Sequence, residues 1–330
     1  MDWCCPFDDE SSWDRPRGRA VGRARGVVGL VRARLADSVS SELAQQAATV
    51  TGMNAMQVSS TSDIILAAPL PSSESYSSIS TYEWCPRRYA YRYVERLPGE
   101  VAPDQFAFGT AIHRAFEVFV RQRIESHVAS GPEPDPEVLW AAFGEAIDIS
   151  GCTPDAAARY HVRAQPVLAR FLVHELESAG EPIGVEMGFG VDLDVPGDSA
   201  GVRFVGFIDR VDRRPDGTVE VVDYKTGVPK DQASVDRDVQ LTAYAFALAR
   251  GGLHDPADGG VLPPAARLGL YFADEGRMVW TTRSPDQLSA FCRELLAVVR
   301  QVRLREFAAR PSQQRCAWCE YRRLCPEAVA

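Results

Sequence analysis

Residues 185–227 constrain the fold most, because they contain three successive stretches with the sequence features of strands. In residues 185–195 every second position is Val, Met, Phe or Leu, which is the pattern of a half-buried strand. Residues 202–214 and 218–227 give two further strands, and the turn sequence Arg214-Pro215-Asp216-Gly217 joins them. Three strands connected so closely predict an antiparallel meander.

Helical spacing dominates on both sides of these strands. Helices are predicted in residues 76–97, with Ser77 or Ser78 as N-cap, and then in residues 104–126, 136–148 and 155–179. After the meander we expect a helix over 238–251, strands over 266–274 and 277–283, and a helix from 285 to about 310. The fold class is therefore α+β, with a central mixed sheet flanked by helices.

The first 62 residues differ in composition from the rest. They are rich in Arg and Gly and then in small polar residues, which predicts a disordered leader. A further hypothesis places the true start of translation at Met53 or Met56. Residues 63–330 are predicted to form one domain, which includes a helical insertion at 114–182 and a cysteine cluster at 316–325.

Charge and hydropathy limit the possible classes of protein. No apolar run approaches the roughly 20 residues that would span a bilayer, so we expect a cytoplasmic protein without a membrane partner. The formal net charge of -9 argues against a generally basic nucleic-acid-binding surface. A local positive groove beside clustered carboxylates remains compatible with it.

The meander carries the candidate catalytic groups. Because side chains alternate along a strand, Asp223 and Lys225 share one face of theirs. On the neighbouring strand Val205, Phe207, Asp209 and Val211 share a face, so Asp209 is an acid in otherwise apolar surroundings. Pairing across the turn brings Asp209 toward Asp223, and two close carboxylates favour a divalent cation such as Mg²⁺. An adjacent lysine suits phosphodiester hydrolysis.

Five sequence motifs in order carry a resemblance to a known family. GFIDRVD and VVDYKTG, with FGTAIH upstream, QLTAY downstream and the cysteines at the end, resemble the PD-(D/E)xK nuclease superfamily in its RecB-like form. That form includes nuclease domains of bacterial recombination enzymes and CRISPR adaptation nucleases. The resemblance runs from about Tyr76 to Cys325 and implies a restriction-endonuclease-like core.

The resemblance also assigns roles to single residues. It implies that Asp209, Asp223 and His113 bind Mg²⁺ or Mn²⁺, with an added oxygen from the Tyr224 carbonyl, and that Lys225 is the catalytic lysine.

Three further residues match family positions. Gln240 and Tyr244 match its Q-x3-Y motif and lie one helical turn apart, where they could contact the lysine region or DNA. Glu186 matches an early acidic position and is expected in a supporting catalytic role, although a solvated strand glutamate explains it equally well. Asp212 is expected to be a structural ion-pair partner.

The cysteines suggest a metal centre. Cys316, Cys319 and Cys325 have the spacing C-x2-C-x5-C, and Cys85 precedes Pro86. In a reducing compartment such thiols favour metal binding over disulfides. They resemble the four ligands of a [4Fe-4S] cluster in iron-sulfur nucleases of the same superfamily, which implies an N-terminal helical region clamped to the C-terminus. A structural zinc or a redox-active pair remains open.

Basic and aromatic residues surround these cysteines. Arg87, Arg88, Tyr89, Arg322 and Arg323 would be gathered into a patch suited to single-stranded DNA. A solvated arginine face is the alternative.

Taken together, these features predict a metal-dependent DNA nuclease. We expect an exonuclease that acts on single-stranded or frayed DNA ends in repair or recombination, with a helicase or another repair protein as a candidate partner. Two alternatives stay open, namely a CRISPR adaptation nuclease that trims DNA before integration, and a non-catalytic DNA-binding or partner-docking module.

Overall fold

The computed structural model describes residues 68–100, 104–198 and 201–329. The leader predicted for residues 1–62 lies outside the described residues, and the domain boundary after it stays a prediction. The helices in chain order are α3 (Tyr76–Trp84), α4 (Pro86–Tyr89), the π-helix η1 (Ala90–Val94), α5 (Asp104–Val128), α6 (Glu137–Asp148), α7 (Pro154–Glu177), α8 (Gln232–Val235), α9 (Val239–Ala249), α10 (Pro285–Arg303) and α11 (Gln313–Ala317). The strands are β1 (Ser73–Glu74), β2 (Glu181–Leu193), β3 (Val202–Arg213), β4 (Val219–Lys225), β5 (Ala265–Phe272) and β6 (Arg277–Thr281).

These strands form one mixed sheet in the order β1-β3-β4-β5-β6, with β2 paired to β3. The β2–β3 and β3–β4 pairs are antiparallel, which confirms the predicted meander. The β4–β5 pair is parallel, because the connection between these strands contains α8 and α9 and is long enough for a crossover. The α+β fold class with a central mixed sheet is thus confirmed.

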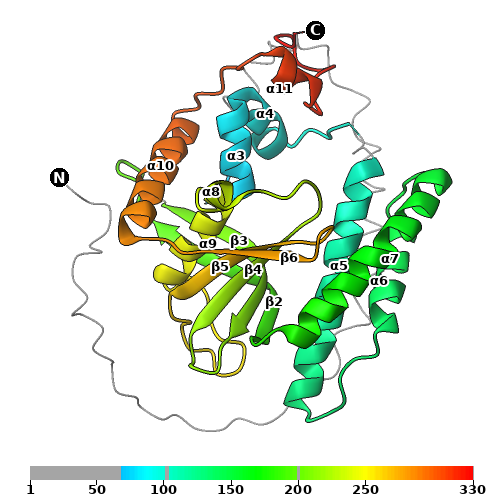
Figure 1. Cartoon of the computed structure of the whole chain (residues 1–330). Coiled ribbons are helices and arrows are strands. Elements are labelled where there is room, and N and C mark those ends of the chain that lie inside the picture. The colour runs from blue at the N-terminus through cyan, green and yellow to red at the C-terminus, as the bar shows by residue number, and fades with distance from the viewer. Residues whose placement is uncertain (1–67, 101–103, 199–200, 330) are drawn as a thin grey trace, which may run out of the picture. The chain divides into compact units, whose positions relative to one another are not determined.

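Helices cover both faces of the sheet (Figure 1). Helices α5, α6 and α7 form one core with Val222 and Tyr224 of β4 and Tyr271 of β5. On the other face Phe204 of β3 lies 6.3 Å from Phe246 of α9 and 6.0 Å from Phe291 of α10, measured between ring centroids. Strand β4 is therefore buried from Val219 to Tyr224, and this buried stretch includes the charged residues Glu220 and Asp223.

Two helix ends differ from the sequence prediction. Ser75 is the N-cap of α3, and Ser78 occupies the third helical position and completes a capping box, so Ser77 and Ser78 were both wrong as caps. Helix α10 ends at Arg303 and not near residue 310, because Arg305 adopts a left-handed backbone with φ of 57°. Among the described residues, no helix is both long and apolar enough to cross a bilayer.

A buried ion network fastens α7 to the sheet. Arg210 of β3 is 1% exposed; it binds Glu175 of α7, and its Nε lies 2.6 Å from Asp212 Oδ1. Arg123 of α5 lies 2.9 Å from the other oxygen of Glu175. Asp212 thus forms the expected structural ion pair. The network belongs to the strand that carries Asp209, the residue next to Arg210.

Replacing Arg210 with Met should destabilise the fold by about 3–5 kcal/mol, because it leaves Glu175 and Asp212 buried without their partner. Urea unfolding monitored by circular dichroism measures this change. Arg323→Ala is the matched control, since that side chain is 90% exposed and an exposed pair contributes at most about 1 kcal/mol. Equal stability of both variants would show that the buried network does not hold α7 on the sheet.

Candidate active site

The sheet forks where β3 and β4 separate. Their antiparallel pairs run from Arg213–Val219 to Arg210–Val222 and continue no further. Beyond that point the backbone N–H of Tyr224 donates to the side chain of Asp209, at 2.9 Å from Oδ2. The carboxylate thus takes the place of a strand carbonyl, which holds Asp209 in the fork beside Asp223.

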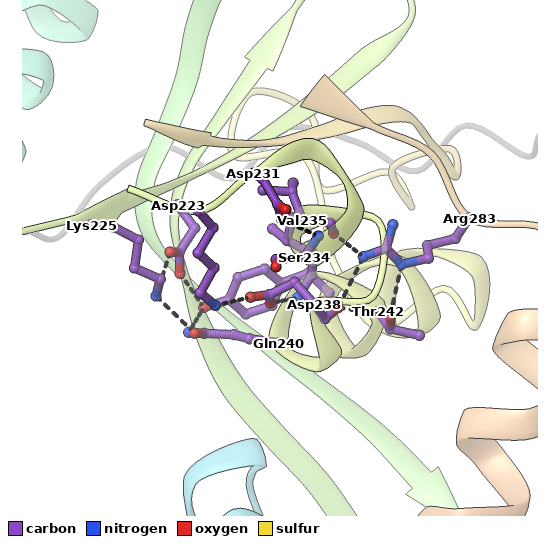
Figure 2. A network of polar contacts seen from close by, with 12 residues as sticks. Asp223, Lys225, Asp231, Ser234, Val235, Asp238, Gln240, Thr242 and Arg283 are labelled. Carbon is purple, nitrogen blue, oxygen red and sulfur yellow. Dashed lines mark hydrogen bonds and ion pairs between the residues drawn. The ribbon is translucent and has the colours of Figure 1, made fainter. Parts of the chain in front are cut away.

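A closed ring of polar contacts occupies the fork on the α9 side (Figure 2). Lys225 Nζ lies 2.6 Å from Asp223 Oδ2 and donates to Gln240 Oε1 at 2.9 Å. Gln240 donates to the Tyr244 hydroxyl at 2.7 Å, and that hydroxyl donates to Asp223 Oδ1 at 3.2 Å. The one-turn spacing of Gln240 and Tyr244 on α9 therefore places both against the acid and the lysine of β4.

His113 approaches the fork from α5. Its Nδ1 lies 3.4 Å from Asp209 Oδ2, and its ring meets the Tyr224 ring edge-on with 6.1 Å between centroids. Gly109, one helical turn earlier, permits this approach, because a Cβ there would lie 2.9 Å from Thr226 Oγ1. In the sequence this glycine is only one letter of a motif, and Thr226 carries no signal that marks it as a neighbour.

Glu186 lies next to the fork with an unusual backbone. Its φ of 48° is left-handed, which is costly for a residue with a side chain. It lies between the pairs Val185–Arg210 and Met187–Ile208, and so falls opposite Asp209. Burial and the charge of Glu117 raise its pKa, and Asp223 adds to this effect. The pKa of Glu186 thus depends in part on the charge of Asp223. A supporting role of Glu186 in catalysis stays a prediction.

Burial sets the protonation of these groups. It raises the pKa of Asp209 to about 6, and it raises the pKa of Asp223 to about 6 with a further contribution from the charge of Asp209. Burial lowers the pKa of His113. Burial also opposes the charge on Lys225, but the charge of Asp223, its contact with Lys225 and the charge of Asp209 together exceed this effect and raise the pKa of Lys225. At neutral pH the site thus holds two anionic acids, a neutral histidine and a cationic lysine.

This donor set fits a hard divalent cation. Asp223 is 1% exposed, and its Oδ2 lies 2.6 Å from Lys225 Nζ. Two carboxylates with raised pKa values and one neutral imidazole suit Mg²⁺ or Mn²⁺. In the described part of the chain, no group of three or more His, Cys, Asp or Glu side chains is arranged closely enough to hold a metal ion. The fit therefore rests on the chemistry of the donors.

The strand face beside Asp209 differs from the prediction. Asp209 was expected on an otherwise apolar face with Phe207, but the Phe207 side chain is 65% exposed, whereas Phe204 and Ile208 on the other face are fully buried. This strand face is thus open to solvent at Phe207, whereas the Asp209 side chain two residues on is only 14% exposed.

All four candidate cluster cysteines line one pocket. Cys85 caps α4, and Cys316, Cys319 and Cys325 belong to the C-terminal segment. Burial and the charge of Glu320 raise the pKa of the Cys319 thiol. The Arg310 backbone N–H donates to Cys85 Sγ at 3.5 Å. The thiols that line this pocket therefore come from both the N-terminal and the C-terminal parts of the described chain.

The prediction that Tyr89 belongs to the DNA-binding patch is wrong. Tyr89 is fully buried, stacks on Phe307 and donates its hydroxyl to Glu74 at 2.5 Å, so no base can reach it. The turn from α4 into η1 directs this side chain into the core.

The arginines of the patch differ in exposure. Arg88 is paired with Glu320 at 2.7 Å and Arg87 with Glu327 at 3.8 Å. Arg322 and Arg323 are exposed. The C-terminal half of the patch is thus the accessible part.

A forked mixed sheet with two acids and a lysine at the fork defines a nuclease-like site. Residues 73–326 match the PD-(D/E)XK nuclease superfamily, and the chain belongs to that superfamily. The match includes every strand of the sheet and all four candidate cluster cysteines.

Individual relatives cover smaller parts of the chain. Three ATP-dependent helicase/deoxyribonuclease subunits, from Streptococcus agalactiae strains of serotypes Ia, V and III, are 28% identical to this chain over 187 residues. The aligned part covers 53% of this chain and 16% of each relative, so the chain spans a small fraction of their length. The crystal structure of SSO0001 aligns with 14% identity and a TM-score of 0.33, over 65% of this chain and 97% of that one; this value is too low to support an argument.

The raised pKa of Asp209 has a measurable consequence. A carboxyl whose pKa is higher in the folded chain (about 6) than in the unfolded chain (about 4) destabilises the metal-free fold above pH 6, and this effect disappears below pH 4. Asp209→Asn should therefore raise the melting temperature by several degrees at pH 7.5 in EDTA, and the gain should vanish near pH 4. Thermal melts across this pH range test it.

Two comparisons make this result specific. Asp192→Asn is the control, because it makes the same substitution at an aspartate that is 84% exposed. Mn²⁺ should stabilise the wild type but not Asp209→Asn. A variant that is less stable than wild type at every pH would contradict the idea that the buried charge of Asp209 destabilises the metal-free fold.

Proposed function

We propose that the chain is a metal-dependent DNA nuclease that hydrolyses single-stranded or frayed DNA ends as an exonuclease in repair or recombination. The observation that carries the proposal is the convergence of Asp209, Asp223 and Lys225 at the fork, in a chain of the PD-(D/E)XK nuclease superfamily. Similarity to helicase/deoxyribonuclease subunits supports DNA as the substrate and a helicase as partner.

Asp209, Asp223 and His113, with the carbonyl of Tyr224, would hold the cation. A bound divalent cation would act as a Lewis acid that stabilises negative charge on the scissile phosphate. The side chains have separate tasks. The Tyr224 N–H fixes the Asp209 carboxylate, and the Tyr244 hydroxyl fixes the Asp223 carboxylate.

Lys225 acts as a cationic hydrogen-bond donor. Its raised pKa keeps it protonated at neutral pH, so it orients the attacking water and stabilises charge on the phosphate instead of removing a proton. Gln240 holds its Nζ from one side and Asp223 from the other. The water oxygen then forms a bond to phosphorus as the P–O bond to the leaving nucleotide breaks, the water releases a proton to solvent, and the leaving oxygen takes up a proton from solvent.

The presence of lysine rather than arginine at residue 225 supports a chemical role for this side chain. Residues 225 and 230 are the only lysines of a chain with 36 Lys and Arg residues. Arginine is larger, planar and always charged, and it cannot replace a compact ammonium held between two partners. A lysine at the fork therefore points to a chemical requirement.

Lys225→Arg should lower the rate of DNA hydrolysis about 100-fold or more, while Lys230→Arg should keep wild-type activity, since Lys230 pairs with Asp238 at 2.7 Å outside the polar ring of the fork. The assay follows end-labelled single-stranded DNA with Mg²⁺ or Mn²⁺ and anaerobically purified protein. Full activity of Lys225→Arg would show that charge alone suffices. Binding of DNA without cleavage by the wild type would favour a non-catalytic docking module.

The cysteine pocket is proposed to hold a [4Fe-4S] cluster through Cys85, Cys316, Cys319 and Cys325. Its support is that the pocket is lined by all four thiols. Such a cluster would link α4 to the C-terminal segment and restrict the unfolded chain, because the linked residues lie far apart in sequence. Arg322 and Arg323, which are exposed beside this pocket, are proposed to contact the DNA backbone.

Cys85→Ser should abolish bound iron, acid-labile sulfide and visible absorption, and it should lower the melting temperature. Cys152→Ser is the matched control, because Cys152 is also a half-buried free thiol but lies outside the pocket. Metal analysis of the anaerobically purified protein provides the readout. One zinc per chain without iron would support the zinc alternative.

A further inference from the structure

An open strip of sheet leads away from the fork. On β2 the exposed residues Gly188 and Asp192 lie opposite Phe207 and Arg203 of β3. Phe204 on the same strand faces α9 and α10, so alternation directs Phe207 and Arg203 to the opposite side of the ribbon. We call the surface formed by Gly188, Gly190, Arg203 and Phe207 the β2–β3 track.

Phe207 is the most unusual member of the track. It is 65% exposed, although a phenylalanine normally buries its ring. It lies two residues from Asp209, which corresponds to about 7 Å along a strand. An exposed aromatic ring one such step from a catalytic acid is well placed for the base beside the scissile phosphate.

Glycines leave the floor of the track flat. Opposite Phe207, Gly188 has no side chain, and a Cβ there would lie 3.3 Å from the phenyl ring. At Gly190 a Cβ would collide with the Arg203 guanidinium, so that group lies across the strand at this point. Glycine inside a strand often marks the close approach of a ligand, and here two glycines share one face with an exposed ring and a cation.

We propose that the β2–β3 track binds single-stranded DNA next to the active site, with one base stacked on Phe207 and the neighbouring phosphate near Arg203. This inference rests on the proposed nuclease function and names its substrate subsite. Stacking requires an unpaired base with an accessible face, so the track selects single strands over duplex.

Stacking and not charge supplies most of this interaction. Arg203 is 57% exposed and lies 3.4 Å from Asp192, and Glu186 adds a second acid near the fork. The net charge of the strip is therefore small. Loss of Phe207 should accordingly weaken binding equally at low and high salt, unlike loss of a phosphate contact, which changes the salt dependence.

Phe207→Ala should raise the KM for single-stranded DNA about 5- to 100-fold with little change in kcat, because base stacking on one aromatic ring contributes about 1–3 kcal/mol. Phe207→Trp should restore the wild-type KM. Leu176→Ala is the matched control, since Leu176 is an exposed apolar residue on α7. An oligonucleotide with abasic nucleotides next to the cleavage position has no base to stack on Phe207. With this substrate, wild type and Phe207→Ala should have the same KM.

If Phe207→Ala raised the KM equally for normal and abasic substrates, the role of Phe207 would be merely structural. An unchanged KM for normal single-stranded DNA would overturn the track.

Equilibrium binding tests the track separately from catalysis. Oligonucleotides carrying 2-aminopurine should show quenched fluorescence with wild type but not with Phe207→Ala. If wild type quenches but never cleaves DNA, the nuclease proposal fails and the track stands. If wild type cleaves DNA, and wild type and Phe207→Ala quench the fluorescence alike, the track fails and the nuclease proposal stands.

Discussion

The site depends on the hydrogen bond between the Tyr224 N–H and the Asp209 carboxylate. A strand N–H buried in the sheet needs an acceptor, and where β3 turns away from β4 no backbone carbonyl remains for it. The side chain of Asp209 fills that role, so one contact satisfies the backbone and holds the acid beside Asp223. This hydrogen bond favours the charged form of Asp209 and so opposes the rise in its pKa that burial causes.

Helices from both faces meet at this fork, which makes the site a product of the whole domain. His113 arrives from α5 on one face, while Gln240 and Tyr244 arrive from α9 on the other. Arg210, next to Asp209, is locked to α7 by its buried ion network. The helical insertion thus braces the strand that carries the first acid.

Protein contacts also hold the two ends of the described region together around the thiols. Glu320 pairs with Arg88 and Arg92, and the Tyr321 hydroxyl donates to the Leu97 carbonyl. A metal centre in this pocket would therefore reinforce an interface that already has polar and aromatic contacts. The arginines that pair inside this interface are less available to DNA than those beyond it.

The sequence by itself determined the order of elements, the antiparallel meander, the mixed α+β architecture and the motifs that carry the acids and the lysine, because strand alternation and turn residues are local properties. Only the tertiary structure decided which face of each strand is covered: Tyr89 is buried by the turn after α4, and Phe207 is exposed because α9 and α10 pack against the other side of β3. Likewise the left-handed Glu186, the approach of Gly109 to Thr226 and the fork itself depend on contacts between segments far apart in the chain. Local patterns record what a residue prefers, whereas packing between distant elements determines what it contacts.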